Sequence, residues 1–430
     1  MQRMSRVVPL LPPRLLDGAD EPTMERLLTR LPAAAYADCT TRWMRAPLST
    51  DEVPAPRADA STAAATVRRP LRPREHDLVF LSSRTDSTVK VLILSASASV
   101  SVHLIPLPNV SVAEAAAWHQ VVAASMAHDL PGVPAPDPGQ VHAQLTQPAL
   151  GSHRLIWLAT GADGGPVGIA GLRVFTSPGQ EHLSELELHV DPAHRRLGIG
   201  SLLLAEVVAA CHAENRRSLI AAAAADSPGE AFSERRGFSR ALTLDHLLLR
   251  LDELPDADQP LTSDTAPPGY RLAGWTGTVP DEFADAFASA KTAMNDMPVG
   301  DMDYGSVAWD ADRVRAMAKV IADRGDTLLT LAAVHDDGTM AGYTEVLLPQ
   351  GSGPRAQQYD TAVVPAHRGH GLGVWVKTAM VRRLRAEHPD VVEIETDNAE
   401  DNVHMLAVNH RLGYRSYRRT LEFQLDLPSA

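Results

Sequence analysis

Apolar and polar positions along this chain alternate with two different periods. Stretches in which every second residue is apolar predict strands, and stretches with apolar residues every third or fourth position predict helices. In the C-terminal 160 or so residues, the predicted strands are 270–275, 327–334, 342–348, 355–363, 391–396 and 417–425. The predicted helices there are 280–293, 310–324, 374–388 and 402–412. Asp336-Asp337-Gly338 predicts a hairpin turn between two of the strands.

The same local pattern occurs twice. Residues 190–200 read VDPAHRRLGIG and residues 363–373 read VVPAHRGHGLG, at a constant offset of 365 − 192 = 173 residues. In both places a strand-like run precedes the motif, and a helical run follows it, at 201–211 and 374–384. The chain therefore contains an internal duplication, and each copy places a glycine loop between a strand and a helix.

Such a loop forms an anion site. The first N–H groups of a helix have no intrahelical partner, and the helix dipole is positive at that end. Gly198, Gly200, Gly371 and Gly373 would let a phosphate approach the main chain. Neither copy has the Gly-x-Gly-x-x-Gly order of a dinucleotide-binding loop or the Gly-Lys-Ser/Thr of a nucleotide-triphosphate loop.

Length and composition set the domain organisation. A chain of 430 residues with 44% apolar content has room for two or three domains. We expect an N-terminal extension over 1–98, partly disordered and of unknown function, and a first repeat domain over 99–252. A linker rich in proline and aspartate follows over 253–268, and the second repeat domain covers 269–430.

Charge and cysteine content exclude several classes of protein. The formal net charge of −13 argues against nonspecific binding to nucleic acid or to anionic membranes. Cys39 and Cys211 have no disulfide or metal-ligand spacing, so we expect no metal site. The prolines near the start interrupt any signal-peptide pattern, and no run is long enough to span a membrane. These features predict a cytoplasmic protein.

The Arg-x-x-Gly-x-Gly loop resembles motif A of the GNAT superfamily of N-acetyltransferases, in which it holds the pyrophosphate of acetyl-CoA. The segments 402–414 and 231–238 resemble the last helix of that superfamily and its Gly-Phe/Tyr ending. The tandem layout is similar to that of two-domain actinobacterial members. The resemblance implies an α/β fold of two tandem GNAT domains, each a mixed, mostly antiparallel sheet flanked by helices. It also implies acetyl-CoA as cofactor and N-acetyl transfer to a small-molecule amine.

The resemblance carries a cofactor-binding role to both loops and to the strands before them. It implies that the glycine-loop strand and the following strand splay apart to admit the pantetheine arm. In the second copy the expected residues are Ala362, Val363, Val364, Arg368, Gly369, His370, Gly371, Leu372, Gly373 and Asn402. In the first copy they are Leu188, His189, Val190, Arg195, Arg196, Leu197, Gly198, Ile199 and Gly200.

The candidate catalytic bases are Glu345 and Asp360, on neighbouring predicted strands of the second copy. An alkylammonium group must lose a proton before it can attack a thioester, and a carboxylate can take that proton. For Asp360 a solvent-facing or loop-fixing role remains open. Glu185 and Glu187 occupy the matching strand of the first copy, where a catalytic pair and a solvated strand face are both possible.

The tyrosine that often acts as the acid in the superfamily is replaced by Ser233 and Asn409, so the acid is undetermined. The cofactor-contacting asparagine of the superfamily matches Asn402, whereas the first copy has Asp226, whose charge would disfavour a polyanion. We therefore favour the second copy as catalytic, with direct transfer from acetyl-CoA.

Acceptor selection is expected from 295–305, with Asn295, Asp296 and Asp303 as substrate-binding residues for a cationic amine, an amino sugar or an antibiotic. The alternative function is a non-catalytic module that binds or senses acyl-CoA. Either a monomer or a homodimer is compatible with the sequence.

Overall fold

The computed structural model describes residues 79–85, 88–95, 98–106, 110–147, 149–254, 265–350 and 353–428. Most of the predicted N-terminal extension and the middle of the predicted linker lie outside these residues. The described chain forms two compact units. The N-terminal unit contains three strands that pair antiparallel in the order β1-β2-β3, namely β1 (Val79–Thr85), β2 (Thr88–Ser95) and β3 (Ala98–Pro106).

The second unit comprises Ile105–Ala159, Pro166–Arg195 and Ile199–Ala430 and contains both sequence repeats. The first repeat forms α3 (Val112–Asp129), α4 (Pro138–Thr146), β4 (Ser152–Thr160), β5 (Pro166–Phe175), β6 (Leu183–Val190), α5 (Ile199–Ala213), β7 (Ser218–Ala224), α6 (Pro228–Arg235) and β8 (Ser239–Arg250). No described helix has the length and apolarity that a bilayer span requires.

The second repeat follows the predicted order, and the mixed α/β fold class is confirmed. Its elements are β9 (Tyr270–Thr276), α7 (Ala284–Lys291), α8 (Ala311–Asp323), β10 (Thr327–His335), β11 (Met340–Leu348), β12 (Arg355–Val363), α9 (Leu372–Glu387), β13 (Glu393–Ala399), α10 (Val403–Arg411) and β14 (Arg415–Asp426). The expected hairpin joins β10 to β11, with the Gly338 amide bonded to the His335 carbonyl at 2.9 Å.

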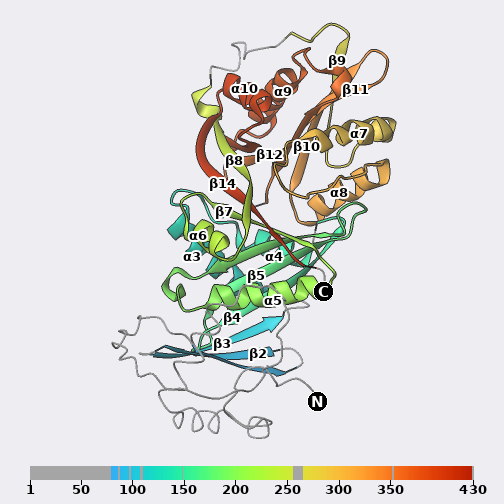
Figure 1. Ribbon diagram of the computed structural model, residues 1–430. Coiled ribbons are helices and arrows are strands. Elements are labelled where there is room, and N and C mark those ends of the chain that lie inside the picture. The colour runs from blue at the N-terminus through green and yellow to red at the C-terminus, as the bar shows by residue number, and fades with distance from the viewer. Residues whose placement is uncertain are drawn as a thin grey trace, which may run out of the picture. The chain divides into compact units, whose positions relative to one another are not determined.

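One sheet runs through both repeats, in the order β4-β5-β6-β7-β14-β8-β13-β12-β11-β10-β9. The last strand of each repeat pairs with the other repeat: β14 lies antiparallel to β7, and β8 lies antiparallel to β13. The exchanged strands β8 and β14 also pair with each other. Figure 1 shows β14 running beside β8 down to β7. Each repeat therefore completes the sheet of the other.

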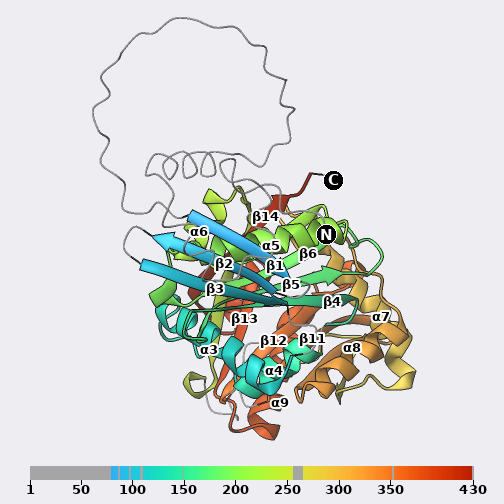
Figure 2. The same cartoon turned by 90° about the horizontal axis from the view of Figure 1, so that it is seen from below.

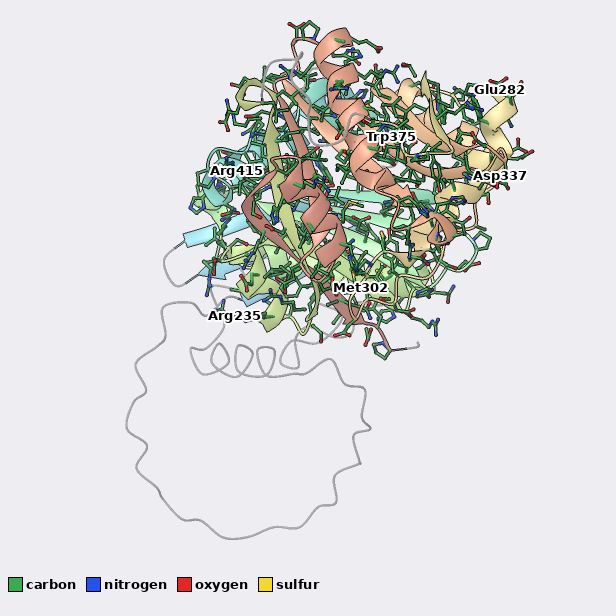
Figure 3. All side chains as sticks on the ribbon, turned by 90° about the horizontal axis from the view of Figure 1, so that it is seen from above. Arg235, Glu282, Met302, Asp337, Trp375 and Arg415 are labelled. Carbon is green, nitrogen blue, oxygen red and sulfur yellow. The ribbon has the colours of Figure 1, made fainter. Side chains whose placement is uncertain are left out.

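Helices cover both faces of the sheet. On β5 of the first repeat, a Cβ added to Gly168 would meet Ile199 and Leu203 of α5, whereas one added to Gly171 would meet Trp118 of α3. Because side chains three positions apart on a strand point to opposite faces, α3 and α5 lie on opposite sides. In the second repeat, Trp375 of α9 packs on one face (Figure 3) and α7 on the other.

The helices form where the apolar period is regular. In α8 the buried residues Val314, Met317, Ala318 and Ile321 follow the three- and four-residue spacing of one helix face. Asp310 caps the start of this helix, because its side chain accepts a hydrogen bond from the Arg313 amide. The helix lies beside α4 of the first repeat (Figure 2), and residues of both helices line a cavity of about 470 Å³.

Glu422 on the exchanged strand β14 makes the stability of the fold pH-dependent. Burial raises the pKa of Glu422 from its usual 4.5 to about 7, and Glu185 and Asp397 act in the same direction. The folded state therefore holds this proton more tightly than the unfolded chain, and the resulting loss of stability develops as the pH rises from about 4.5 to about 7.

We expect Glu422→Gln to stabilise the protein at pH 8, by up to about 3 kcal/mol from linkage, and to leave stability at pH 4.5 nearly unchanged. Urea unfolding at the two pH values measures this difference. An equal effect of the substitution at both pH values would contradict the role of the Glu422 proton.

Candidate active site

The strand that precedes each glycine loop separates from its neighbour. Strands β12 and β13 pair in parallel only at Arg355–Gln357. In the first repeat β6 and β7 pair only at Leu183–Leu186. Beyond these points the edges of β12 and β6 have no strand partner in the described structure, although β13 and β7 continue. The predicted splay is thus confirmed in both repeats, and it leaves main-chain groups free to bind an extended ligand.

Hydrogen-bond alternation fixes which groups face the open edge of β12. The Val364 amide donates to the Ala341 carbonyl on β11 at 2.9 Å. Val363 lies opposite Gly342 in the next pair, where antiparallel bonding turns both main-chain groups outward. The Val363 N–H therefore points to the open edge, while Ala362 pairs with Tyr343 on β11. Of these three predicted cofactor residues, Val363 has the free donor.

The first repeat has the same arrangement. The Asp191 amide donates to the Val167 carbonyl at 3.0 Å, so Val190 directs its N–H to the open edge of β6. Leu188 also directs its N–H to this edge, because it lies two positions before Val190 on the same strand. His189 pairs with Ile169 of β5, and its ring nitrogen Nδ1 lies 3.1 Å from the Ser125 hydroxyl.

The glycine loop of the second repeat can cradle a phosphate. Gly369 and Gly371 have φ of 85° and 76°, and no atom lies within 4 Å of the place where a Cβ would be. The amides of Gly369, His370 and Gly371 have no acceptor among the residues described, and Leu372 and Gly373 begin α9. Free amides, open space and a helix N-terminus fit the diphosphate of coenzyme A.

The corresponding backbone of the first repeat is more strained. Arg196 occupies the position of Gly369 and has φ of 67°, a left-handed conformation that costs a side-chain-bearing residue roughly 1 kcal/mol or more. Leu197 and Gly198 follow, with Gly198 at φ of 87°, before Ile199 and Gly200 begin α5.

The loop arginines fasten the loops to neighbouring segments. Arg195 donates from Nε to the Val190 carbonyl at 3.1 Å and forms two bonds of 2.7 Å with the carboxylate of Asp129 on α3. Arg368 repeats this pattern, with its Nε 3.1 Å from the Val363 carbonyl and an Nη 2.7 Å from Asp296. Asn402 caps α10, because its side chain accepts from the Met405 amide.

Glu345 and Asp360 meet at a buried lysine. Lys291 Nζ lies 2.6 Å from Glu345 Oε2 and 2.7 Å from Asp360 Oδ2. The side chains of Lys291 and Glu345 are fully buried, whereas that of Asp360 is 21% exposed. The structure thus brings the two predicted bases together and adds a cation. Asp360 is the member of this cluster that an acceptor can reach.

Aromatic rings enclose the cation. Lys291 Nζ lies 4.8 Å from the ring centre of Trp309, 5.1 Å from that of Tyr343 and 5.5 Å from that of Phe287. Burial alone would lower the pKa of Lys291, but Asp360 and Glu345 raise it well above its usual value. Burial raises the pKa of Glu345. One cation and two carboxyl groups therefore share a small low-dielectric site, where charge interactions are strong.

A β-bulge presents Asp360 to Lys291. The register between β11 and β12 shifts between Thr344 and Val346, so that Glu345 faces two residues, Tyr359 and Asp360. An extra residue in one strand bends it and redirects its side chains. The pairing of β5 with β6 in the first repeat has no such shift.

The first repeat fills the same space with an indole. Gly171 of β5 pairs with Glu187 of β6, and a Cβ added to Gly171 would lie 3.3 Å from the Trp118 ring. Trp118 is 2% exposed and comes from α3, as Lys291 comes from α7. Glu185 and Glu187 form ion pairs with Arg173 and Arg154 at 3.2 and 3.6 Å.

Lys291 was not among the predicted site residues, although the sequence carries a signal for it. The buried face of α7 consists of Ala284, Phe287, Ala288 and Ala290 together with Lys291. Lysine at the seventh position after Ala284 falls on the apolar stripe, where an unpaired cation is unfavourable and a carboxylate partner is required.

The predicted acceptor loop is fixed by its own contacts. Asn295 exchanges two hydrogen bonds with the main chain of Val307, at 3.0 and 3.1 Å. The Asp303 carboxylate lies 3.3 Å from His182 of the first repeat. Met302, labelled in Figure 3, packs with Tyr304 against Phe175 of the first repeat. Asp296 faces the glycine loop through Arg368, as described above.

Comparison with known proteins agrees with this geometry. The model of the acetyltransferase (GNAT) family matches residues 124–238 and 295–414. A mycothiol acetyltransferase of Clavibacter sepedonicus is 31% identical over 284 residues, which cover 65% of this chain and 83% of the relative. A solved tandem GNAT protein from the clavulanic acid biosynthesis pathway is 26% identical, covers 76% of this chain and 100% of its own, and superposes with a TM-score of 0.65. A GCN5-related N-acetyltransferase from Sphaerobacter thermophilus shares the fold at 18% identity and a TM-score of 0.58, over 76% of this chain and 97% of its own.

Replacing the buried cation tests the cluster. We expect Lys291→Met to destabilise the protein by about 3 to 5 kcal/mol, because the buried Glu345 and the partly exposed Asp360 lose their cationic partner. The control is Lys319→Met, which removes an exposed ion pair on α8 and should cost less than about 1 kcal/mol. Urea unfolding at pH 7 compares the two variants, and equal losses would contradict the buried ion cluster.

Proposed function

Because the chain belongs to the acetyltransferase (GNAT) family, we propose that it transfers the acetyl group of acetyl-CoA directly to a primary amine of a small molecule, and that the second repeat carries the reaction. The observation that supports this assignment is the cluster of Lys291, Glu345 and Asp360 beside the open edge of β12. The first repeat keeps the open edge but has Trp118 and Gly171 where the cluster would be.

Acetyl-CoA supplies the activated acetyl group. The free loop amides of Gly369, His370 and Gly371 and the start of α9 suit its diphosphate, and the outward main chain of Val363 suits its extended arm. The same residues hold the ligand near Asp360, three positions before Val363 on β12.

Asp360 would hold the incoming ammonium group and take one proton from it before the neutral amine attacks the acetyl carbonyl. The C–N bond then forms, the C–S bond breaks, and the surplus proton on the nitrogen goes to the departing thiolate. An alkylammonium with a pKa near 10.4 is almost fully protonated at pH 7, so such an acceptor for the proton matters. Lys291 and Glu345 keep the Asp360 carboxylate in place. The Val363 N–H is a donor on the open edge, where it can stabilise the oxyanion that develops on the acetyl carbonyl.

The acceptor loop keeps a role in this proposal. Asn295 and Asp303 hold the loop against its surroundings, and Asp296 joins it to the glycine loop through Arg368. Arg368 also donates to the Val363 carbonyl, so the loop would border the open edge of β12 where the acceptor meets the thioester.

Removing the charge of Asp360 tests the catalytic assignment. We expect Asp360→Asn to lower kcat/KM about 100-fold or more and to leave the Kd of acetyl-CoA within about twofold. Thioester consumption with a panel of amines measures the first quantity and calorimetry the second. Asp312→Asn, at a fully exposed position on α8, serves as the control. Loss of turnover in Glu187→Gln and not in Asp360→Asn would move the reaction to the first repeat.

Blocking one loop at a time tests the cofactor site. Gly371→Trp places a large side chain in the open space of the second loop, and Gly198→Trp introduces the same side chain at the matching position of the first. We expect Gly371→Trp to weaken acetyl-CoA binding at least about 100-fold and to abolish turnover, whereas Gly198→Trp keeps turnover. Calorimetric titration of acetyl-CoA reports binding. No binding to the wild-type protein would contradict the proposed function itself.

A further inference from the structure

A polar cavity of about 200 Å³ lies where the two repeats meet. The first repeat contributes strand residues and the end of α4, and the second contributes the residue that ends α8. The lining residues are Gln144, Ala149, Arg154, Arg173, Glu185 and Arg324. Three of the six carry a guanidinium group, in a chain whose formal net charge is −13.

The cationic charge of the cavity is only partly neutralised. Arg173 forms an ion pair of 3.2 Å with Glu185, and Arg154 a looser one of 3.6 Å with Glu187. Arg324 donates from Nε and Nη to the Gln147 carbonyl, at 3.0 and 2.6 Å, and forms no ion pair within the described chain. Burial lowers the pKa of Arg324, and Arg154 and Arg173 act in the same direction, whereas Tyr359 and Asp326 oppose them. An anion in the cavity would reduce the repulsion among the three guanidinium groups.

Packed side chains connect the cavity to the cluster of Lys291, Glu345 and Asp360. The Trp309 ring centre lies 4.8 Å from Lys291 Nζ, and Trp309 packs in the same apolar cluster as Leu150, which follows the cavity residue Ala149. On the other side, the Arg173 guanidinium lies 4.4 Å from the ring centre of Phe175, and that ring contacts Tyr304 of the acceptor loop. The cavity is therefore joined by direct packing both to the cluster and to the acceptor loop.

We propose that Arg154, Arg173 and Arg324 bind the anionic group, a carboxylate or a phosphate, of the acceptor whose amine lies at Asp360. The acceptor class is therefore a zwitterion, such as an amino acid derivative or an amino sugar phosphate. This inference rests on the proposed function. The diphosphate of coenzyme A is assigned in this proposal to the glycine loop that follows Val363.

Matched pairs of amines test the proposal. Each pair contains one anionic and one neutral member, such as an L-amino acid and its carboxamide, or glucosamine 6-phosphate and glucosamine. For the pair that is turned over, we expect kcat/KM to be at least about tenfold higher for the anionic member, mainly through KM. The carboxylate and phosphate pairs together identify which anion is used.

Arginine variants of the full chain test whether the cavity arginines cause the preference for the anionic amine. Arg324→Gln and Arg154→Gln should each raise KM for the anionic member at least about fivefold and leave the kinetics of the neutral member within about twofold. Arg315→Gln is the matched control, since Arg315 lies on α8 and pairs with Asp281 away from the cavity. Equal effects of Arg324→Gln and Arg315→Gln, or no preference for the anionic member, would overturn the inference.

If no amine in the panel is turned over, a binding measurement tests whether the cavity binds an anion. Inorganic phosphate and acetate are titrated into protein saturated with acetyl-CoA, so that the glycine loop is occupied. Saturable binding that Arg324→Gln and Arg154→Gln weaken at least about tenfold supports the anion site, and its absence overturns it. A protein that acetylates neutral and anionic amines equally well would retain the proposed function and lose only this inference. A protein that neither binds acetyl-CoA nor consumes its thioester would lose both.

Discussion

The antiparallel pairing of β8 with β14 is the constraint on which the second unit depends. Both neighbours of each strand come from the other repeat, because β14 lies between β7 and β8 and β8 lies between β14 and β13. Main-chain groups of a central strand must be paired to be buried. Removing either strand would therefore leave open edges in both halves, and the two repeats have to fold together. The same pairing holds together the two repeats that line the cavity containing Arg154, Arg173 and Arg324.

Within this shared sheet the two repeats carry chemically different side chains at equivalent positions. One copy buries Trp118 against Gly171, which gains apolar packing without unpaired charge. The other buries Lys291 with Glu345 and Asp360, an arrangement for which desolvation is costly. Structures keep such costly groups where chemistry needs them. In the proposed function the charged copy carries the reaction and the apolar copy supports it.

Local patterns in the sequence predicted the elements and the glycine loops, because periodicity and turn residues act over short distances. Strand β12 was predicted with its observed limits, whereas the predicted helix over 280–293 is split into shorter helical segments. Glu345 and Asp360 could be selected as carboxylates on adjacent strands. Their lysine partner, the bulge at Tyr359 and the exchange of β8 and β14 depend on contacts between distant segments, which periodicity does not encode. The grouping of Arg154 with Arg324 across the repeats is nonlocal for the same reason.

The strand exchange also bears on the ancestry of the chain. A precursor with a single repeat would have ended in a strand that its own sheet could not accommodate in this way, and two copies could satisfy each other by reciprocal insertion. Such a precursor would have been a symmetric homodimer with two identical clefts. Once the two copies are joined in one gene, the two clefts no longer have to be identical. A substitution could then alter one cleft and leave the other intact, which is how an indole and a buried lysine can occupy equivalent places in one polypeptide.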